Sequence, residues 1–300
     1  MRREIRDANF SIFSRHLKEA LQTYDRLVIF IPRKGYANFI LCKDCGFAIK
    51  CPNCSTSLVA YDDTLKCHHC NHRQPKPKTC PNCQSYNLKS YGIGIDKVEA
   101  ELKKFFSYQN LAKPRIAKLT SEVKKLSFDW NILLATQSLF RYAIHVPLLA
   151  IMNADALIHI PDYRAEEMLL RQTLLLASMA DHLLIQTYNP DDPALVAAAT
   201  GKVKEFWDEE LKQRKELGYP PFTHLVKLQS RHRNREMLRR NAIGLAAQLG
   251  GTAYPAFLEH ERGMYVYNIL LKFQNPNDKI QILRRVPPDW QIDVDPISIV

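Results

Sequence analysis

The chain has 300 residues, an apolar share of 46% and a formal charge of +11, from 42 basic and 31 acidic residues. This length suggests two domains with a core of ordinary size, and the basic excess favours an anionic partner, most commonly nucleic acid. The longest apolar candidate for a membrane span, residues 146–160, is interrupted by Asn153 and Asp155, and the charged first residues show no secretory signal. We therefore expect a cytoplasmic protein with no membrane partner.

The N-terminal part of the chain alternates between short apolar runs and amphipathic patterns. Strands are predicted at residues 26–31, 38–41, 132–135, 148–152 and 183–187, and helices at residues 11–24, 95–106 and 164–180. Ser11 is the expected N-cap of the first helix. Strands that alternate with helices favour an α/β unit around a largely parallel sheet, into which a cysteine-rich segment is inserted.

A different pattern follows Pro193. A long helix is predicted at residues 194–217, and its acidic triplet at 208–210 is interpreted as a solvated face. Beyond it we predict strands at residues 224–229, 264–273 and 291–294, with helices at residues 234–249 and 279–286 between them. This βαβαβ order indicates a small α+β domain of about 80 residues.

All eight cysteines of the chain lie in one short segment. They form four C-x-x-C knuckles: Cys42/Cys45, Cys51/Cys54, Cys67/Cys70 and Cys80/Cys83. In a reducing compartment this pattern favours metal binding over disulfides. Two knuckles complete a closed tetrahedral zinc site, so the eight cysteines predict two Zn²⁺ ions. A closed site leaves no ligand position for water, and both ions are therefore expected to be structural.

The sequence does not fix which knuckles pair. The twelve residues between Cys54 and Cys67 resemble a zinc-ribbon loop. This spacing favours one site of Cys51, Cys54, Cys67 and Cys70, nested inside another of Cys42, Cys45, Cys80 and Cys83. An interleaved pairing is the alternative. Redox catalysis is a rival use of the knuckles, but a thioredoxin-type site needs a single knuckle on a βαβ unit.

Nucleotide and DNA signals differ in strength. The Gly201–Lys202 pair is not a Walker A loop, because Val196 replaces the first glycine and Val203 the Ser/Thr. Basic residues that could contact DNA phosphates, or an aromatic that could stack on a base, are Arg33, Lys34, Tyr36, Lys76, Lys78, Arg231, Arg233, Arg235 and Arg239. For the arginine cluster an ordinary exposed turn and helix face is the alternative, and for Tyr36 it is packing against the cysteine module.

The order of motifs resembles the C-terminal half of the bacterial primosomal protein N′ (PriA) replication-restart helicase family. The motifs are Arg33–Ala37, the four knuckles, Gly92–Asp96, Asn153–Asp155, Pro161–Ala165, Gln186–Pro190, Arg214–Phe222 and Asp293–Pro296. The resemblance implies a degenerate RecA-like second helicase lobe (residues 1–41 and 84–205), a two-zinc insertion (42–83) and an α+β C-terminal domain (206–300). It also implies the nested zinc pairing. The implied partners are branched or single-stranded DNA, primosome proteins and single-strand-binding protein, in replication restart and repair.

The chain departs from the family in its helicase motifs. The 3′-DNA-end-binding domain, the winged helix and the first helicase lobe have no counterpart, and the Walker A and B motifs are absent with them. The family's Gly-Thr-Gln-x-x-x-Lys-Gly appears as Ala135–Tyr142. The family's Gln-Val-Ala-Gly-Arg-Ala-Gly-Arg aligns with Leu175–His182, so Met179 and His182 replace both arginines. Neither side chain supplies the permanent planar charge that stabilises a transferring phosphate.

These features give three hypotheses. The leading one is a PriA-like DNA-binding protein of replication restart that is not catalytic on its own, for which ATP is not an expected cofactor. The second is half of a split ATP-dependent 3′–5′ helicase that works with a separate first lobe. The third is a zinc scaffold that contacts only proteins.

Overall fold

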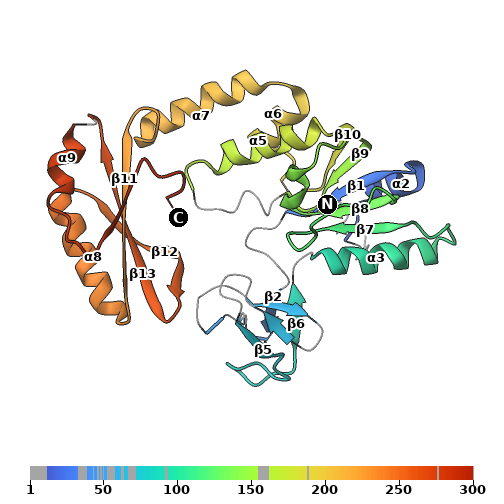
Figure 1. The fold of residues 1–300 in the computed structure, drawn as a ribbon, viewed down its shortest axis with the longest axis horizontal. Helices are drawn as coiled ribbons and strands as arrows, with labels where there is room; N and C mark the ends of the chain where they lie inside the picture. Colours follow the sequence, from blue (N-terminus) through green and yellow to red (C-terminus); the bar gives the residue numbers. More distant parts are fainter. Residues whose placement is uncertain are drawn as a thin grey trace. The chain divides into compact units, whose positions relative to one another are not determined.

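The computed structural model describes most of the chain (Figure 1). The described residues are 12–32, 39–42, 44–45, 47, 49, 51–52, 58–61, 64–66, 72–91, 94–154, 162–187, 189–275 and 277–299. The chain splits into two compact units. The first comprises Met1–Phe39, Ser90–Ile160 and Ala165–Lys202, and the second comprises Ile40–Lys89, Pro161–Arg164 and Val203–Val300.

A five-stranded sheet of order β10-β9-β1-β8-β7 forms the centre of the first unit. Its strands are β1 (Leu27–Phe30), β7 (Ile116–Leu119), β8 (Ile132–Ala135), β9 (Val146–Ile151) and β10 (Ala180–Ile185). All neighbouring strands are parallel. Every residue of β1 and β8 is buried, as expected for central strands of a parallel sheet that is covered on both faces. The predicted α/β unit with a parallel sheet is therefore confirmed.

Helices cover both faces of this sheet. On one face, α2 (Arg15–Thr23) and α3 (Ile95–Tyr108) pack Leu17 and Leu102 against strand residues such as Ile29. On the opposite side of the sheet from α3, α5 (Ala165–Ala177) packs against α6 (Pro193–Thr200) and β10 (Figure 1). A short 3-10 helix, η1 (Gln137–Arg141), follows β8. The first helix begins later than predicted, at Arg15, and its N-cap is Ser14, whose hydroxyl accepts a hydrogen bond from the N–H of Leu17. The predicted cap, Ser11, lies outside the described residues.

The single helix predicted at residues 194–217 is two helices. Gly201 ends α6 with a φ of +74°, in the left-handed region that glycine adopts without strain, and α7 (Val203–Leu217) follows. The predicted solvated face at 208–210 is partly wrong. Glu210 is buried because its carboxylate binds the Arg214 guanidinium, with 2.7 Å between Oε1 and Nε.

The C-terminal part of the second unit contains a four-stranded antiparallel sheet of order β12-β13-β11-β14. Its elements are β11 (His224–His232), α8 (Arg235–Leu249), β12 (Thr252–Glu261), β13 (Met264–Phe273), α9 (Asp278–Leu283) and β14 (Gln291–Val294). The sequence prediction lacked β12. With it, the order becomes βαββαβ, which interlocks two split βαβ units. The predicted α+β character is unchanged.

The hydrophobic core of this domain lies between one face of the sheet and its helices. Leu238 and Ala246 of α8 pack against Val226, Ile269 and Leu271 of the strands. Residues that alternate with these along β11 and β13 point to the opposite face. That face carries Lys227 of β11 and Tyr254 of β12. Lys227 lies opposite Leu270 of β13 and Tyr254 lies opposite Asn268, two residues that share one side of that strand.

The cysteine-rich segment, also in the second unit, contains only short strands among its described residues. β2 (Phe39–Cys42) pairs with β6 (Leu88–Tyr91), and β3 (Val59–Tyr61), β4 (Thr64–Lys66) and β5 (Arg73–Pro75) form an antiparallel sheet. Among the described residues of the segment, the buried hydrophobic cluster consists of Ile40, Ile49, Cys51, Leu58 and Leu65. A bound metal would add stability to a core of this size. Within the ranges that the structure describes, no helix is long and apolar enough to cross a bilayer.

Candidate metal centre

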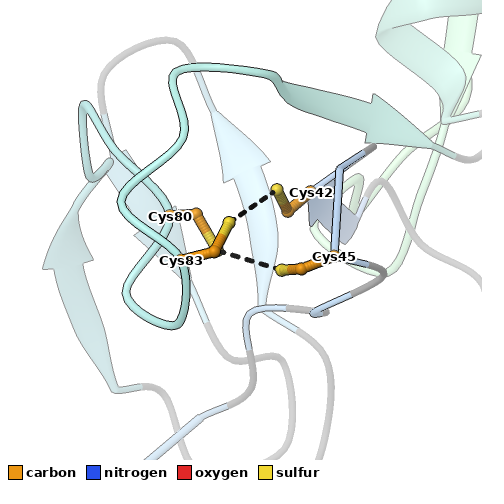
Figure 2. Close-up of side chains that lie close together, drawn as sticks. All are labelled: Cys42, Cys45, Cys80 and Cys83. Atoms are coloured by element: carbon orange, nitrogen blue, oxygen red, sulfur yellow. Dashed lines mark hydrogen bonds between the residues drawn. The ribbon is translucent and has the colours of Figure 1, made fainter.

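The sulfurs of four cysteines from two distant parts of the sequence lie close together (Figure 2). The Sγ atoms of Cys42 and Cys83 lie 3.6 Å apart, as do those of Cys45 and Cys80. All four sulfurs lie within 4.8 Å of one another. The structure thus brings together one of the two cysteine sets that the nested scheme predicted.

Each of the two knuckles contains a backbone turn of the same kind. The N–H of Cys42 donates to the carbonyl of Phe47 at 2.9 Å, and the N–H of Cys80 donates to that of Ser85 at 2.8 Å. Each bond spans five residues and folds the two-residue spacer back on itself. In the second knuckle, the N–H of Asn82 also points at the Cys80 sulfur, 3.4 Å away.

A polar contact ties the two knuckles to each other. Asp44, inside the first knuckle, accepts hydrogen bonds from the Ser85 hydroxyl and from the Asn87 side-chain amide, the latter at 2.8 Å. The bond from Ser85, followed by that from Asn87, lowers the pKa of the Asp44 carboxyl below its usual value. The sequence carried no signal for this tie, because the three residues lie about forty positions apart and match no metal motif.

The pKa values of two thiols in the cluster, Cys45 and Cys83, are shifted in opposite directions. Hydrogen bonding, first from the Asn82 side chain, lowers the pKa of Cys45 to about 6. The backbone N–H of Ser85 favours the Cys83 thiolate, but the neighbouring Cys45 and burial outweigh it and raise the pKa of Cys83 to about 12. Thiolates this close repel one another. A metal ion at their centre removes that repulsion, so the donor set and its spacing fit a bound cation.

The sulfur geometry suits a tetrahedral ion. With metal–sulfur bonds of about 2.3 Å, a regular tetrahedron places its sulfurs about 3.8 Å apart. The observed 3.6 Å separations are close to this value. Cys42 and Cys80 are buried, whereas Cys45 and Cys83 are exposed, so the cluster lies at the surface of its module. This cluster can hold one metal ion with four protein ligands.

The other cysteines fall mostly outside the described residues. Cys51 is described and is buried in the small hydrophobic cluster of the module. Cys54, Cys67 and Cys70 lie outside the described residues, so the second zinc site stays a prediction. Of the candidate DNA contacts, Arg33, Lys34 and Tyr36 also lie outside them. Lys76 and Lys78 are exposed and lie between β5 and Cys80.

The arginine cluster predicted to contact DNA is partly neutralised by acidic side chains. Arg231 lies 3.5 Å from Glu261, and Arg235 forms a close ion pair with Glu259. Both glutamates belong to β12, the strand that the sequence prediction lacked. Arg239 pairs with Glu236 one helical turn away, at 3.2 Å. Arg233 is exposed in the turn between β11 and α8. Arg233 therefore stays a candidate for phosphate contact.

Residues at three motif positions of the family contact other parts of the first unit. Gln186 follows β10, and its side chain accepts from the N–H of Ser14 at 2.7 Å and donates to the carbonyl of Ile12 at 3.2 Å. Met179 is buried in the turn between α5 and β10. His182, on β10, places its ring edge against Tyr24, with 6.1 Å between the ring centroids. Met179 therefore presents no charge, and His182 lacks the permanent planar charge of an arginine.

The structure therefore defines an α/β protein with a parallel sheet, a four-sulfur cluster that could hold a metal ion, and an additional α+β domain. Residues 215–297 match the family model described as the primosomal protein N C-terminal domain.

The chain is also similar to curated proteins along nearly its whole length. It is 34% identical to the replication restart protein PriA of Thermotoga maritima over 94% of the chain. It is 28% identical to PriA of Bacillus subtilis over 98% and 29% identical to PriA of Synechocystis over 100% of the chain. The aligned regions cover 42%, 40% and 41% of these relatives, so the chain spans about two fifths of their length. The chain therefore belongs to the PriA family and corresponds to the C-terminal part of its members.

Proposed function

We propose that this chain is a DNA-binding component of replication restart and primosome assembly, with structural zinc and no catalytic activity of its own. The proposal depends chiefly on one observation: the four-sulfur cluster is retained in a chain whose similarity to replication restart proteins extends over nearly its full length. The domain limits proposed are residues 1–41 and 84–205, 42–83, and 206–300. The proposed location is the bacterial cytoplasm.

Zinc is the proposed metal because its preferred ligands are thiolates in a closed tetrahedral set. Cys42, Cys45, Cys80 and Cys83 would hold the first ion, and Cys51, Cys54, Cys67 and Cys70 the second. When bound, such an ion supplies folding energy rather than reaction chemistry. The small hydrophobic cluster of the module supports this role, because it offers little stability by itself.

DNA is the proposed partner because of the charge of the chain and its relatives. A net charge of +11 attracts phosphates at long range, and exposed Arg233, Lys76 and Lys78 offer contacts. Branched DNA, single-stranded DNA, single-strand-binding protein and other primosome proteins are the partners that family membership suggests. The ion pairs of Arg231 and Arg235 with glutamates reduce the share of binding that these two arginines supply.

The residues at the positions where the family would contact a nucleotide support the proposed absence of catalysis. Met179 is buried, His182 packs on Tyr24, and Gly201 is the C-cap of α6 rather than part of a phosphate loop between a strand and a helix. One observation favours the alternative of a split helicase half, namely the complete five-stranded parallel sheet, which a RecA-like lobe would need. A companion first lobe would then supply the nucleotide site.

The test is binding of the purified chain to fork DNA by fluorescence anisotropy between about 50 mM and 200 mM salt. The proposal expects affinity to fall steeply with salt and to depend on bound zinc. It also expects no DNA-stimulated ATP hydrolysis by the chain alone. Salt-independent binding or no binding favours the protein-only scaffold. ATP hydrolysis that appears only with a separately encoded first lobe favours the split helicase.

A further inference from the structure

Two residues that follow β14 are held by side chains from three separate parts of the second unit. The Asp162 carboxylate accepts hydrogen bonds from the Ser298 hydroxyl at 2.7 Å and from the N–H of Ile299 at 2.9 Å. Lys227 of β11 donates to the carbonyl of Ser298 at 2.8 Å. The Tyr254 hydroxyl of β12 donates to the carbonyl of Ile299 at 2.5 Å.

Three of these four hydrogen bonds are made to main-chain atoms. A carboxylate accepts a peptide N–H, and an ammonium and a phenol each donate to a peptide carbonyl. This arrangement suits recognition of a peptide through its backbone, as peptide-binding surfaces commonly use. The side chain of Ile297 is 81% exposed, so no apolar pocket selects the residue next to the clamped pair. The recognition is therefore carried by polar contacts.

Asp162, which binds both residues, is itself held in place by its surroundings. Asp162 is 9% exposed, and its other carboxylate oxygen accepts from the N–H of Arg164 at 2.9 Å. The next residue, Tyr163, stacks on Tyr219 with 4.9 Å between ring centroids and an interplanar angle of 2°. Burial raises the pKa of Tyr254 to about 12, so its hydroxyl stays a donor at neutral pH. A fixed set of donors and acceptors loses little entropy on binding.

We propose that Asp162, Lys227 and Tyr254 form a peptide-binding clamp, which the chain's own segment Ser298–Ile299 occupies. The clamp lies on the sheet face opposite the α8-packed core and takes the main chain of a peptide. The occupying segment acts as a detachable strap, since Ser298 and Ile299 lie outside the sheet, four and five residues beyond the end of β14. This proposal is independent of DNA binding and of zinc.

The first test supplies the strap in trans. In the full chain, the double variant Ser298→Ala/Ile299→Pro removes the hydroxyl and the N–H that Asp162 binds, and leaves the clamp intact. A fluorescent peptide with the sequence of residues 293–299 is the probe, followed by anisotropy. Binding to the double variant is expected to be at least about tenfold tighter than to the unsubstituted chain, where the strap competes.

Two controls make the test specific. Adding Asp162→Asn to the double variant keeps an acceptor for Arg164 but presents an amide to the peptide N–H, and should weaken binding at least about tenfold. Asp289→Asn, the same change at an exposed site before Trp290, should leave binding unchanged. A probe methylated on the nitrogen of its Ile299 position should bind the double variant as weakly as the unmethylated probe binds the Asp162→Asn variant. Equal binding by all variants, or binding insensitive to Asp162→Asn, overturns the proposal.

A second measurement does not depend on a displaced strap. In the otherwise unsubstituted chain, hydrogen exchange of the Ile299 amide should become at least about tenfold faster with Asp162→Asn, whereas amides of β13 should be unaffected. Unchanged protection at Ile299 in a folded Asp162→Asn variant contradicts the clamp. Unchanged protection with Asp289→Asn completes the comparison.

Discussion

Gly251 permits a close approach of β12 to β13 that no other residue allows. A β-carbon at this position would lie 2.4 Å from the Cδ2 atom of Leu271 and 2.9 Å from the backbone carbonyl oxygen of Leu270. Ordinary contacts of this kind are about 3.5–4.0 Å long. Leu271 is 1% exposed, so it has no empty space to move into. The oxygen of Leu270 belongs to the β12–β13 ladder and cannot shift without disturbing it.

We therefore expect Gly251→Ala to destabilise the C-terminal domain by about 1–3 kcal/mol, the usual result of overpacking a core. For a domain of about 80 residues each kcal/mol lowers the melting temperature by about 4–8 °C. Differential scanning calorimetry of the full chain measures the shift. Hydrogen exchange at β13 amides assigns it to this domain.

Gly244 provides the matched control. It lies in α8, and a β-carbon there would have no atom within 4 Å. Gly244→Ala should therefore stabilise the domain by about 0.5–1 kcal/mol, because alanine is the better helix former. If Gly251→Ala melts at or above the temperature of the unsubstituted chain, the packing described for β12 and β13 is wrong.

Three further predictions concern the metal centre, DNA binding and pH. Cys80→Ser should release the ion bound with Cys80 and loosen the two knuckles that it joins. This would be seen as the loss of one zinc ion and as faster hydrogen exchange at the amides of Cys42 and Cys80, with the melting of the C-terminal domain unchanged. Arg233→Glu should weaken fork-DNA binding and flatten its salt dependence more than Arg235→Glu, because Arg235 is already paired; equal effects would contradict the ion-pair assignment. The hydrogen bond from Lys279 lowers the pKa of Asp295 in the folded chain. The ionised Asp295 therefore stabilises the fold above about pH 4, and this stabilisation is lost as the pH falls through the lowered pKa of Asp295. Asp295→Asn should therefore flatten this acid loss in a pH series of melting curves, and an unchanged series would argue against the ion pair.

The sequence predicted the parallel sheet because its strands are continuous apolar runs. The runs at residues 132–135 and 148–152 mark β8 and β9 to within two residues. The break between α6 and α7 was missed, since residues on both sides of Gly201 favour helix and only the left-handed backbone of the glycine separates them. Local propensity does not decide such a break.

The missing strand β12 had the larger consequence. Its ten residues include Pro255 and two glutamates, which are uncommon in strands. A turn in which Arg262 and Gly263 both take positive φ connects it to β13. Because the strand was not predicted, the glutamates that pair with Arg231 and Arg235 could not be placed. The arginine cluster therefore looked more strongly basic in the sequence than it is in the fold.

The knuckle spacing predicted metal binding, but the partners of each knuckle required the fold. Pairing depends on which chain segments meet, and β2 with β6 brings the first and last knuckles together. The tie from Asp44 to Ser85 and the contacts of Asp162 with Ser298 had no sequence signal at all. Both join residues far apart along the chain through single hydrogen bonds, which leave no periodic pattern.

The most direct test of the account is the metal content of the purified, folded chain, measured by atomic emission. Eight cysteines in two closed sites should hold two zinc ions per chain. Cys80→Ser should remove the ion at the described cluster and leave the other in place. A folded chain that contains no zinc, or one whose zinc content is unaffected by Cys80→Ser, would contradict the assignment of this cluster as a structural metal site.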